Sequence, residues 1–238
     1  MIIIITKNYE ELSAKAAEVM LGVVKQNPEA VLGLATGTTP LGLYAKMIAD
    51  RKEKGTDYSQ IRTVNLDEYK GLPKTHEQSY AYFMKKNLFD GLGITPEQTN
   101  IEDGTARDEE AECLRYDAML EELLRDIQLL GLGSNGHIAF NEPGADFGAH
   151  IHVANLTQST LQAKAELFGG ADKVPAQGLT LGIADVMAAR HILLVANGVH
   201  KAEIIRRALE GPITPEVPAS VLQLHPNLDI LLDEAAAQ

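Results

Sequence analysis

Short, continuous apolar runs alternate along the chain with longer stretches in which apolar residues recur at helical spacing. The apolar runs, which fit buried strands, occupy residues 2–6, 30–35, 61–66, 127–133, 191–197 and 228–233. The stretches with helical spacing occupy residues 10–26, 40–54, 78–89, 108–124 and 200–211. Continuous apolar strands that alternate with helices predict an α/β fold, with a mostly parallel sheet covered by helices on both faces.

Residues 144–176 interrupt this alternation, because they contain several Gly and Ala residues and show only weak periodicity. A long irregular stretch in a compact α/β chain is often a lid or a binding loop. An ordinary surface excursion explains the same pattern equally well. We find no internal repeat and no linker, so we expect a single domain over residues 1–238, with a lid at approximately 144–176.

Composition narrows the class of protein. The chain is 45% hydrophobic and 23% charged, as in ordinary globular proteins. Its formal net charge is −12 and its Lys and Arg residues are not clustered, so we expect no nucleic-acid partner. No apolar run approaches the roughly 18–20 residues of a membrane span, and the first residues lack the features of a signal peptide. We therefore expect a cytoplasmic protein with no membrane partner.

The single cysteine, Cys113, excludes an internal disulfide and a multi-cysteine zinc site. We interpret it as a small apolar residue on a helix. In an open α/β sheet, ligands bind outside the carboxyl ends of the strands. Candidate chemistry is therefore sought in the polar residues that follow each predicted strand.

The first such strand end carries Thr36, Gly37, Thr38 and Thr39, directly before Pro40. Proline suits the first turn of a helix, and the free N–H groups at a helix start attract anions. The sequence lacks the G-K-[ST] signature of a nucleotide P-loop. It therefore indicates either a phosphate site or a plain helix cap at Thr39.

The second strand end carries Asp67 and Glu68, on a predicted loop closed by Gly71 and Pro73. A carboxylate placed in the cleft could take a proton from a carbon beside a carbonyl group. Acidic residues after strands are also common as helix caps or solvated turns. The pattern alone leaves both interpretations open.

The third strand end, "GLGSNG" at residues 131–136, spells G-x-G-x-x-G. A dinucleotide-binding turn would continue into a long helix and be followed by an acidic residue about 20 positions later. Here Pro143 arrives early and residues 150–158 contain no acid, so a bound dinucleotide is not expected. The glycines instead form a bend that presents His137 with Glu142 close by, a usable acid/base pair near neutral pH.

Four segments in this order resemble the glucosamine-6-phosphate deaminase family: "LATGTTPLGLY", "NLDEYKGL", "GLGSNGHIAFNEPG" and "VPASVLQLHPNLDILLDEAA". The resemblance covers nearly the whole chain, although the Thr-Gly loop is shared with relatives such as 6-phosphogluconolactonase. It implies a single modified doubly wound, Rossmann-like domain. It also implies that glucosamine 6-phosphate and water give fructose 6-phosphate and ammonia, with an amino-sugar phosphate as the small-molecule partner and neither cofactor nor metal.

The resemblance also implies a role for each catalytic residue. His137 assists opening of the pyranose ring by moving a proton at the ring oxygen, and Glu142 holds that imidazole. Asp67 takes the C2 proton of the open-chain form. Asn135 stands where many members have aspartate, which implies a changed hydrogen-bond network around the histidine.

The phosphate is expected on the loop of Thr36–Thr39, with Lys201 adding a positive charge. Many members carry a phosphate-binding arginine in the lid, and here Glu166 occupies that place. A carboxylate there would repel phosphate. Either Lys164 substitutes for the arginine or the lid packs differently.

Two alternatives remain: lactone hydrolysis on the same scaffold, and a non-catalytic sugar-phosphate-binding protein. The motif "NLDEY" argues against the lactonase, which needs no proton-abstracting base at Asp67. Longer members that form allosteric hexamers continue past residue 238. We therefore expect a monomer or a small homo-oligomer, without activation by N-acetylglucosamine 6-phosphate.

Overall fold

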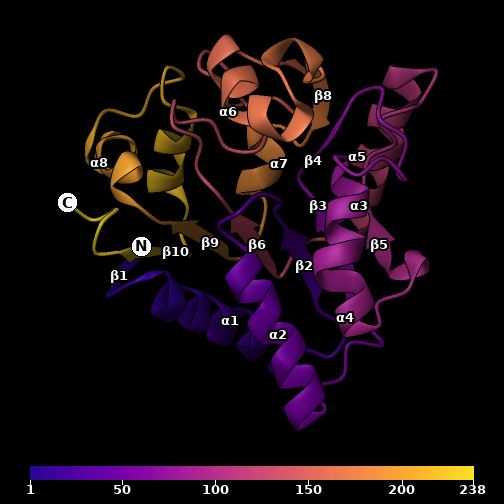
Figure 1. Cartoon of the computed structure of the whole chain (residues 1–238), viewed down its shortest axis with the longest axis vertical. Helices are drawn as coiled ribbons and strands as arrows, with labels where there is room; N and C mark the ends of the chain where they lie inside the picture. The colour runs from indigo at the N-terminus through magenta and orange to yellow at the C-terminus, as the bar shows by residue number, and fades with distance from the viewer.

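A seven-stranded sheet in which every neighbouring pair is parallel forms the centre of the computed structural model, which describes residues 1–238 (Figure 1). From left to right in the figure its order is β1-β10-β9-β6-β2-β3-β5. The strands are β1 (Ile2–Thr6), β2 (Val31–Leu34), β3 (Arg62–Asn65), β5 (Thr99–Asn100), β6 (Ile127–Leu130), β9 (Ile192–Ala196) and β10 (Leu228–Asp233). The predicted α/β class and the largely parallel sheet are confirmed.

The predicted helices are present with small shifts of their ends. They are α1 (Tyr9–Gln26), α2 (Leu41–Lys54), α5 (Glu109–Glu122) and α8 (Ala202–Glu210). The stretch predicted as one helix over 78–89 is divided into α3 (Tyr80–Met84), a π-helix (Lys85–Phe89) and α4 (Asp90–Leu92). Short 3₁₀ turns occupy Pro96–Gln98, Ala171–Lys173, Val199–Lys201 and Pro218–Leu224.

Local sequence explains where the two longest helices begin and end. The side chain of Asn8 accepts a hydrogen bond from the N–H of Glu11 at the start of α1, and Glu10 and Glu11 place negative charge in its first turn. Helix α2 ends at Gly55, which has a left-handed φ of 71°. These two helices pack against each other below the sheet in Figure 1.

A second, antiparallel sheet was not predicted. Its order is β4 (Asp67–Tyr69), β8 (Gln177–Thr180) and β7 (His152–Asn155). The chain leaves β3 at Asn65 and enters β4 only two residues later, so Asp67 pairs with Thr180 across the second sheet. The prediction of a loop at Asp67 and Glu68 is therefore wrong.

The irregular structure expected for residues 144–176 is also wrong. This segment contains β7, helix α6 (Gln158–Phe168) and a 3₁₀ turn, and helix α7 (Ile183–Met187) follows β8. The apolar period of α6 is weak because its one fully buried residue, Thr160, is polar. Figure 1 shows this part of the chain above the carboxyl ends of the parallel strands.

Two apolar clusters hold these layers together. The larger contains 50 buried residues and includes both faces of the parallel sheet. The smaller joins the second sheet to α3 and is built on Tyr69, Tyr80 and Phe140, whose ring centroids lie 4.8–5.8 Å apart. No helix is both long enough and apolar enough to cross a membrane.

Candidate active site

A cavity of about 270 Å³ lies where the carboxyl ends of β9, β6, β2 and β3 meet the second sheet and α6. Its lining includes predicted residues from four separate strand ends and Lys164 of the lid segment. They are Thr36, Gly37, Thr38, Thr39, Asp67, His137, Lys164 and Lys201. Residues that are distant in the sequence are therefore brought to one edge of the sheet, as expected for an open α/β fold.

A larger hollow of about 600 Å³ lies beside α3 and β5. Two of its three basic side chains are paired with acids, because Lys85 contacts Asp90 at 2.5 Å and Arg115 contacts Glu112 at 2.6 Å. None of the predicted site residues lines it. The smaller cavity is the better candidate for an anionic ligand.

The loop of Thr36–Thr39 is shaped for close approach of an anion. Gly37 adopts a φ of 106°, which a side chain would strain, and Tyr9 Oη donates to the carbonyl oxygens of Thr38 and Thr39 at 3.1 and 3.0 Å. The alternative role of Thr39 as a helix cap is wrong. The cap position of α2 is Pro40 and has no side-chain bond, whereas the Thr39 hydroxyl donates to Asn197 Oδ1 at 2.9 Å. The cap residue itself therefore satisfies no N–H group of the first turn, although the Gly42 N–H donates to Tyr9 Oη at 2.9 Å.

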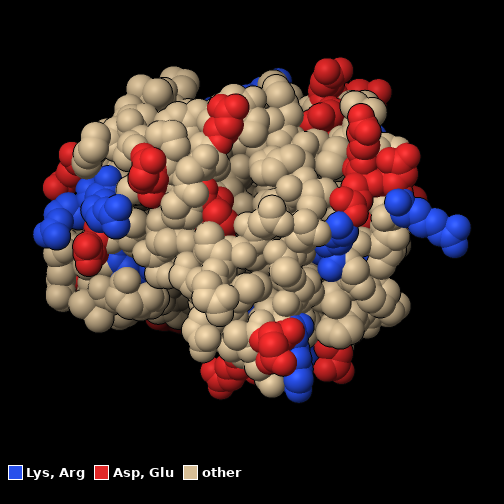
Figure 2. All heavy atoms as spheres, turned by 90° about the horizontal axis from the view of Figure 1, so that it is seen from above, with Lys and Arg blue, Asp and Glu red and all other residues tan.

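Two lysines place positive charge inside the cavity. Lys201 Nζ donates to the Leu132 carbonyl oxygen at 2.6 Å, which fixes its ammonium beside the glycine-rich turn. Burial lowers the pKa of Lys201, and the charge of Lys164 lowers it further. On the face seen from above, charged side chains lie mostly around the rim and the centre is largely uncharged (Figure 2).

Lys164 enters the cavity from α6, whereas Glu166 does not. Glu166 is exposed and is absent from the cavity lining. Two residues along an α-helix correspond to a rotation of about 200°, so the two side chains face different directions. The acidic residue at the place of the family's arginine therefore lies outside the cavity, whereas the lysine lines it.

Asp67 has a low-polarity environment. Only 6% of its surface is exposed, and burial raises the pKa of its carboxyl from 3.8 to about 7. Lys164 opposes this shift and the charge of Glu68 adds to it. A carboxylate with a pKa near neutrality can both accept a proton and return it at physiological pH.

Glu68, the neighbour of Asp67, has a structural role. Its carboxylate accepts hydrogen bonds from the N–H groups of Tyr69, Tyr80 and Ala81 at 2.7, 2.9 and 2.9 Å. These bonds satisfy donors at the start of α3. Of the two adjacent acids in "NLDEY", Asp67 therefore faces the cavity and Glu68 bonds the start of α3.

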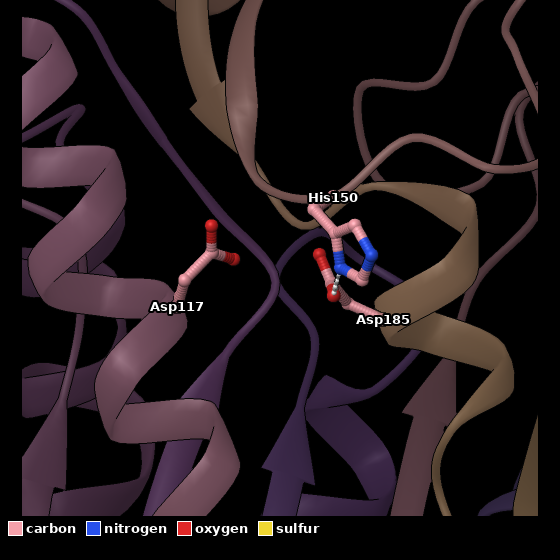
Figure 3. A group of neighbouring side chains, drawn as sticks. All are labelled: Asp117, His150 and Asp185. Atoms are coloured by element: carbon pink, nitrogen blue, oxygen red, sulfur yellow. Dashed lines mark hydrogen bonds and ion pairs between the residues drawn. The ribbon is translucent and has the colours of Figure 1, made fainter.

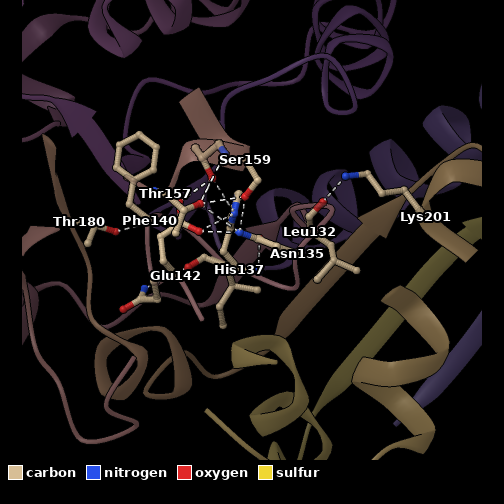
Figure 4. A network of polar contacts seen from close by, with 12 residues as sticks. Leu132, Asn135, His137, Phe140, Glu142, Thr157, Ser159, Thr180 and Lys201 are labelled. Atoms are coloured by element: carbon tan, nitrogen blue, oxygen red, sulfur yellow. Dashed lines mark hydrogen bonds and ion pairs between the residues drawn. The ribbon is translucent and has the colours of Figure 1, made fainter. Parts of the chain in front are cut away.

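His137 stands in front of a hydrogen-bonded carboxylate (Figure 4). Its Nδ1 lies 3.4 Å from Glu142 Oε2, and the amide of Asn135 donates to the same oxygen at 2.7 Å. Thr160 Oγ1 donates to Glu142 Oε1 at 2.5 Å. Because Nδ1 faces the carboxylate, Nε2 is the nitrogen left for the cavity.

These contacts keep Glu142 ionised. Burial favours the neutral acid, but hydrogen bonds from His137 and Thr160, the charge on His137 and the bond from Asn135 together lower the pKa of Glu142 from 4.5 to about 2. Glu142 and Asn135 do not line the cavity themselves. They lie behind His137 and orient it.

The glycines of "GLGSNG" make room for the imidazole. A Cβ atom at Gly133 would lie 2.3 Å from Cε1 of His137, a distance at which the ring would have to move. Gly136 has a φ of 90°, and Ala139 has a φ of 51°, the one positive value outside glycine. This strained backbone lies beside the predicted acid/base pair, as is common at active sites.

Sequence reasoning missed the contribution of α6. Thr160 holds Glu142, and Ser159, Thr160 and Ala163 line the cavity together with Lys164. The spacing of residues 160, 163 and 164 is that of one helical face, and this was the available signal. Tyr80, Phe140, Asn197 and His200, which also line the cavity, carried no comparable pattern.

With the geometry established, comparison with known proteins decides the family. The family described as "Glucosamine-6-phosphate isomerases/6-phosphogluconolactonase" matches residues 6–230. The chain belongs to this family. A glucosamine-6-phosphate deaminase of Geobacillus sp. (strain WCH70) is 50% identical over 230 residues, which cover 96% of this chain and 92% of the relative. One from Clostridium perfringens (strain ATCC 13124) is 45% identical over 237 residues, covering 99% and 98%.

Solved structures of the family agree in fold. A monomeric glucosamine-6-phosphate deaminase superposes with a TM-score of 0.98 at 43% identity, covering 100% of this chain and 99% of the other. The 6-phosphogluconolactonase of Trypanosoma brucei superposes with a TM-score of 0.79 at 22% identity, covering 99% and 97%. At that identity the second likeness shows the shared fold alone.

Proposed function

We propose that this chain is a glucosamine-6-phosphate deaminase, which converts glucosamine 6-phosphate and water into fructose 6-phosphate and ammonia. One observation carries the proposal: Asp67, with a pKa of about 7, and the oriented His137 face one cavity that also holds two lysines. The names of its relatives, at 45–50% identity over nearly the whole chain, support the same reaction.

Substrate binding in this proposal rests on the phosphate group. The cavity is lined by Lys164, by Lys201 and by the loop of Thr36–Thr39 that precedes α2. A protein with a net charge of −12 repels a dianion at long range, so these local charges must supply the attraction. The phosphate would then fix the sugar with its other end toward His137 and Asp67.

Ring opening is the first chemical step. His137 moves a proton at the ring oxygen, and the pyranose opens to the aldehyde. Ionised Glu142 supports the imidazole in the orientation that presents Nε2 to the sugar. Asn135 shares the same carboxylate, so the aspartate found in many relatives is replaced by a neutral donor.

Proton transfer from C2 to C1 is the second step. The C2–H of the open-chain form is acidified by the neighbouring aldehyde, and ionised Asp67 removes it while the aldehyde oxygen takes a proton from the substrate's ammonium group, which gives an enolamine. Return of the proton from Asp67 to C1 gives an iminium at C2. Water adds to this carbon and ammonia leaves, which completes fructose 6-phosphate. Asp67 ends the cycle ionised.

The deciding assay supplies glucosamine 6-phosphate and follows ammonia and fructose 6-phosphate together. Equal release of both products is expected from the folded protein, and negligible release from the Asp67→Asn variant. The exposed carboxylate Glu166 gives a matched control, since Glu166→Gln should retain activity. Absence of both products would overturn the proposal. Hydrolysis of 6-phosphogluconolactone in parallel would favour the lactonase instead.

We also propose that residues 1–238 act as one domain and as a monomer, with residues 144–176 serving as a lid. The monomeric relative at a TM-score of 0.98 supports the oligomeric state. Light scattering should give the mass of one chain, and kinetics should be hyperbolic and insensitive to N-acetylglucosamine 6-phosphate. A hexameric mass with sigmoidal kinetics would contradict this.

A further inference from the structure

Three potential metal ligands from distant parts of the chain meet outside the proposed active site. They are Asp117 on α5, His150 just before β7, and Asp185 in the first turn of α7 (Figure 3). One ligand atom from each lies within 4.8 Å of the other two. None of the three lines the active-site cavity. We propose that these side chains form a binding site for a divalent first-row metal ion, with Zn²⁺ as the reference ion.

His150 and Asp185 form the rigid half of this site. His150 Nδ1 lies 2.6 Å from Asp185 Oδ1, while the second carboxylate oxygen of Asp185 accepts the Gly182 N–H at 3.1 Å. The N–H of Ala184 donates to the Ala149 carbonyl oxygen at 3.0 Å, so the backbone on either side is also fixed. The Asp185 carboxylate is therefore oriented, with the imidazole beside it, before any ion arrives.

The backbone of this half is packed too closely to open. A Cβ atom at Gly182 would lie 2.0 Å from the Ala149 carbonyl oxygen. The carboxyl of Asp185 is only 8% exposed, whereas the imidazole of His150 is 67% exposed. The pair thus has one buried, oriented carboxylate and one face open to solvent, through which an ion and its waters can enter.

Asp117 supplies the third ligand from a different layer. In Figure 3 its carboxylate points toward the pair. Burial raises the pKa of Asp117, and the negative charge of Asp185 raises it further. Two carboxylates that disfavour each other's charge gain most from a shared cation.

The nearby guanidinium of Arg125 does not take the place of such a cation at the two carboxylates. Arg125 donates from Nη2 to the backbone carbonyl oxygen of Asp185 and not to its carboxylate. Glu121 adds further negative charge near Asp117. The cluster therefore keeps an excess of negative charge when His150 is neutral.

The donor set of one imidazole nitrogen and two carboxylate oxygens suits Zn²⁺ and its first-row neighbours. With bonds of about 2.1 Å in tetrahedral geometry, the ligand atoms lie about 3.4 Å apart, and water takes the fourth position. The His150–Asp185 pair must open slightly and Asp117 must move inward by roughly 1.4 Å. The ion replaces the proton shared by the pair, so binding to the protonated pair releases one proton.

The position of the site defines its effect. An ion there joins α5 to the start of β7 and to α7, and so fastens the second sheet to the main body. Binding to the folded state alone raises the midpoint of thermal unfolding with ion concentration. The catalytic rate should stay unchanged, because no ligand contacts the proposed substrate cavity.

Calorimetric titration of the whole protein with Zn²⁺ tests the proposal. One ion should bind per chain with a Kd below ~100 μM, and Asp117→Asn and His150→Gln should each weaken binding by at least ~tenfold. Asp117→Asn is the sharper variant, because it leaves the His150–Asp185 pair intact. Exposed His150 provides a second variant whose folding is not in question. Thermal unfolding without metal should be nearly the same for wild type and His150→Gln.

Matched controls come from the same chain. His191 and Asp229 form a similar pair, with 3.0 Å between Nε2 and Oδ2, but no third carboxylate joins them in a metal-ligating group. Asp229→Asn should leave Zn²⁺ binding unchanged. Cys113→Ser should also leave it unchanged, which separates the site from the half-buried thiol on α5.

The proposal would be overturned if the wild type gave no heat of binding up to about 1 mM Zn²⁺. It would also be overturned if both Asp117→Asn and His150→Gln bound Zn²⁺ as the wild type does, or if Cys113→Ser lost binding. Retention by Asp117→Asn with loss in His150→Gln would also count against it, since a simple two-ligand pair would then suffice. These tests are independent of the proposed deamination, because binding is measured without substrate.

Discussion

Two carboxylates of the proposed active site, Asp67 and Glu142, are buried to nearly the same extent, with 6% and 9% of their surface exposed. Their pKa values nevertheless move in opposite directions. Burial raises that of Asp67 to about 7, while hydrogen bonds that outweigh burial lower that of Glu142 to about 2. A small exposed surface does not by itself determine the charge of a carboxyl group; the donors around it contribute as well.

Glu102 extends this comparison to a third environment. It is completely buried, and neither oxygen of its carboxyl has a hydrogen-bond partner. Burial raises its pKa well above the ordinary value, and the charge of Asp67 adds to this shift. The three carboxyl groups thus differ in their polar partners. Glu102 has none, Asp67 has the charge of Lys164 nearby, and Glu142 has four bonded groups.

The two environments suit two different tasks. Asp67 can exchange a proton near neutral pH, as a base that acts on carbon must. Glu142 remains ionised throughout the cycle, as a group that orients an imidazole must. Changes to each residue should therefore have different sizes and different pH dependence.

The largest effect is expected from Asp67→Asn. This change removes the base while keeping the shape of the side chain, so kcat should fall on the order of 10³- to 10⁴-fold. Exchange of the C2 proton with deuterated solvent should disappear, while binding of the sugar phosphate is largely retained. Deuterium incorporation followed by NMR is the measurement, and continued exchange would remove Asp67 as the base.

Glu142→Gln should have the second largest effect. The imidazole loses its ionised partner, and kcat should fall on the order of 10²-fold. In the wild type the folded-state pKa of Glu142 is depressed, so its ionised form stabilises the fold above pH 4.5, and this contribution is lost as pH falls toward 2. Unfolding curves at pH 2–5 should show a smaller loss in the variant. An identical loss of stability in wild type and variant would contradict the hydrogen-bond network around Glu142.

Lys164→Met should have a more moderate effect, on both the binding of substrate and the pKa of Asp67. Loss of a charged phosphate ligand should raise KM by ~tenfold or more, because such a hydrogen bond contributes about 1.5–3 kcal/mol. Lys164 lowers the pKa of Asp67, so its removal should shift the acidic limb of kcat/KM from about 7 to higher pH. The exposed Lys173→Met is the matched control and should change neither quantity. If the acidic limb of the kcat/KM profile did not shift, Lys164 would not influence the pKa of Asp67.

The smallest effect is expected from Glu166→Arg. Glu166 is exposed and lies outside the cavity lining, so KM should change by less than about twofold, as for a surface substitution. If Glu166 did repel the substrate phosphate, as its place in the sequence suggested, an arginine here would lower KM. Such a decrease would show that α6 rotates or moves when substrate binds.

The sequence predicted which residues would meet, because parallel strands place their carboxyl ends along one edge. The turn after β6 and the loop after β2 were found in this way. The second sheet was not predicted, because β4 is only three residues long and two of them are acidic. Its strands gain stability from tertiary pairing with β8 and not from their own propensity.

The charge states of the acidic residues in the site could not be predicted from the sequence either. Two residues of α6 adjust these shifts: a hydrogen bond from Thr160 helps to lower the pKa of Glu142, and the charge of Lys164 limits the rise that burial causes in the pKa of Asp67. That helix lies in the segment whose pattern was too weak to predict structure. The resemblance to a family assigned roles to the acids, but only their three-dimensional neighbours explain how each could perform its role.

The pairing of β1 with β10 has a consequence for how the protein is made. Strand β1 completes its hydrogen bonds only with β10, far later in the chain, since Ile2–Thr6 pairs with Asp229–Asp233. The carboxylate of Asp233 also holds the N–H of Gly198, at the start of the turn that carries Lys201. During translation the nascent chain therefore exposes an unpaired β1 edge until β10 emerges, and contacts so distant in sequence form slowly. The finished enzyme should acquire its phosphate site at the same late moment as its closed sheet.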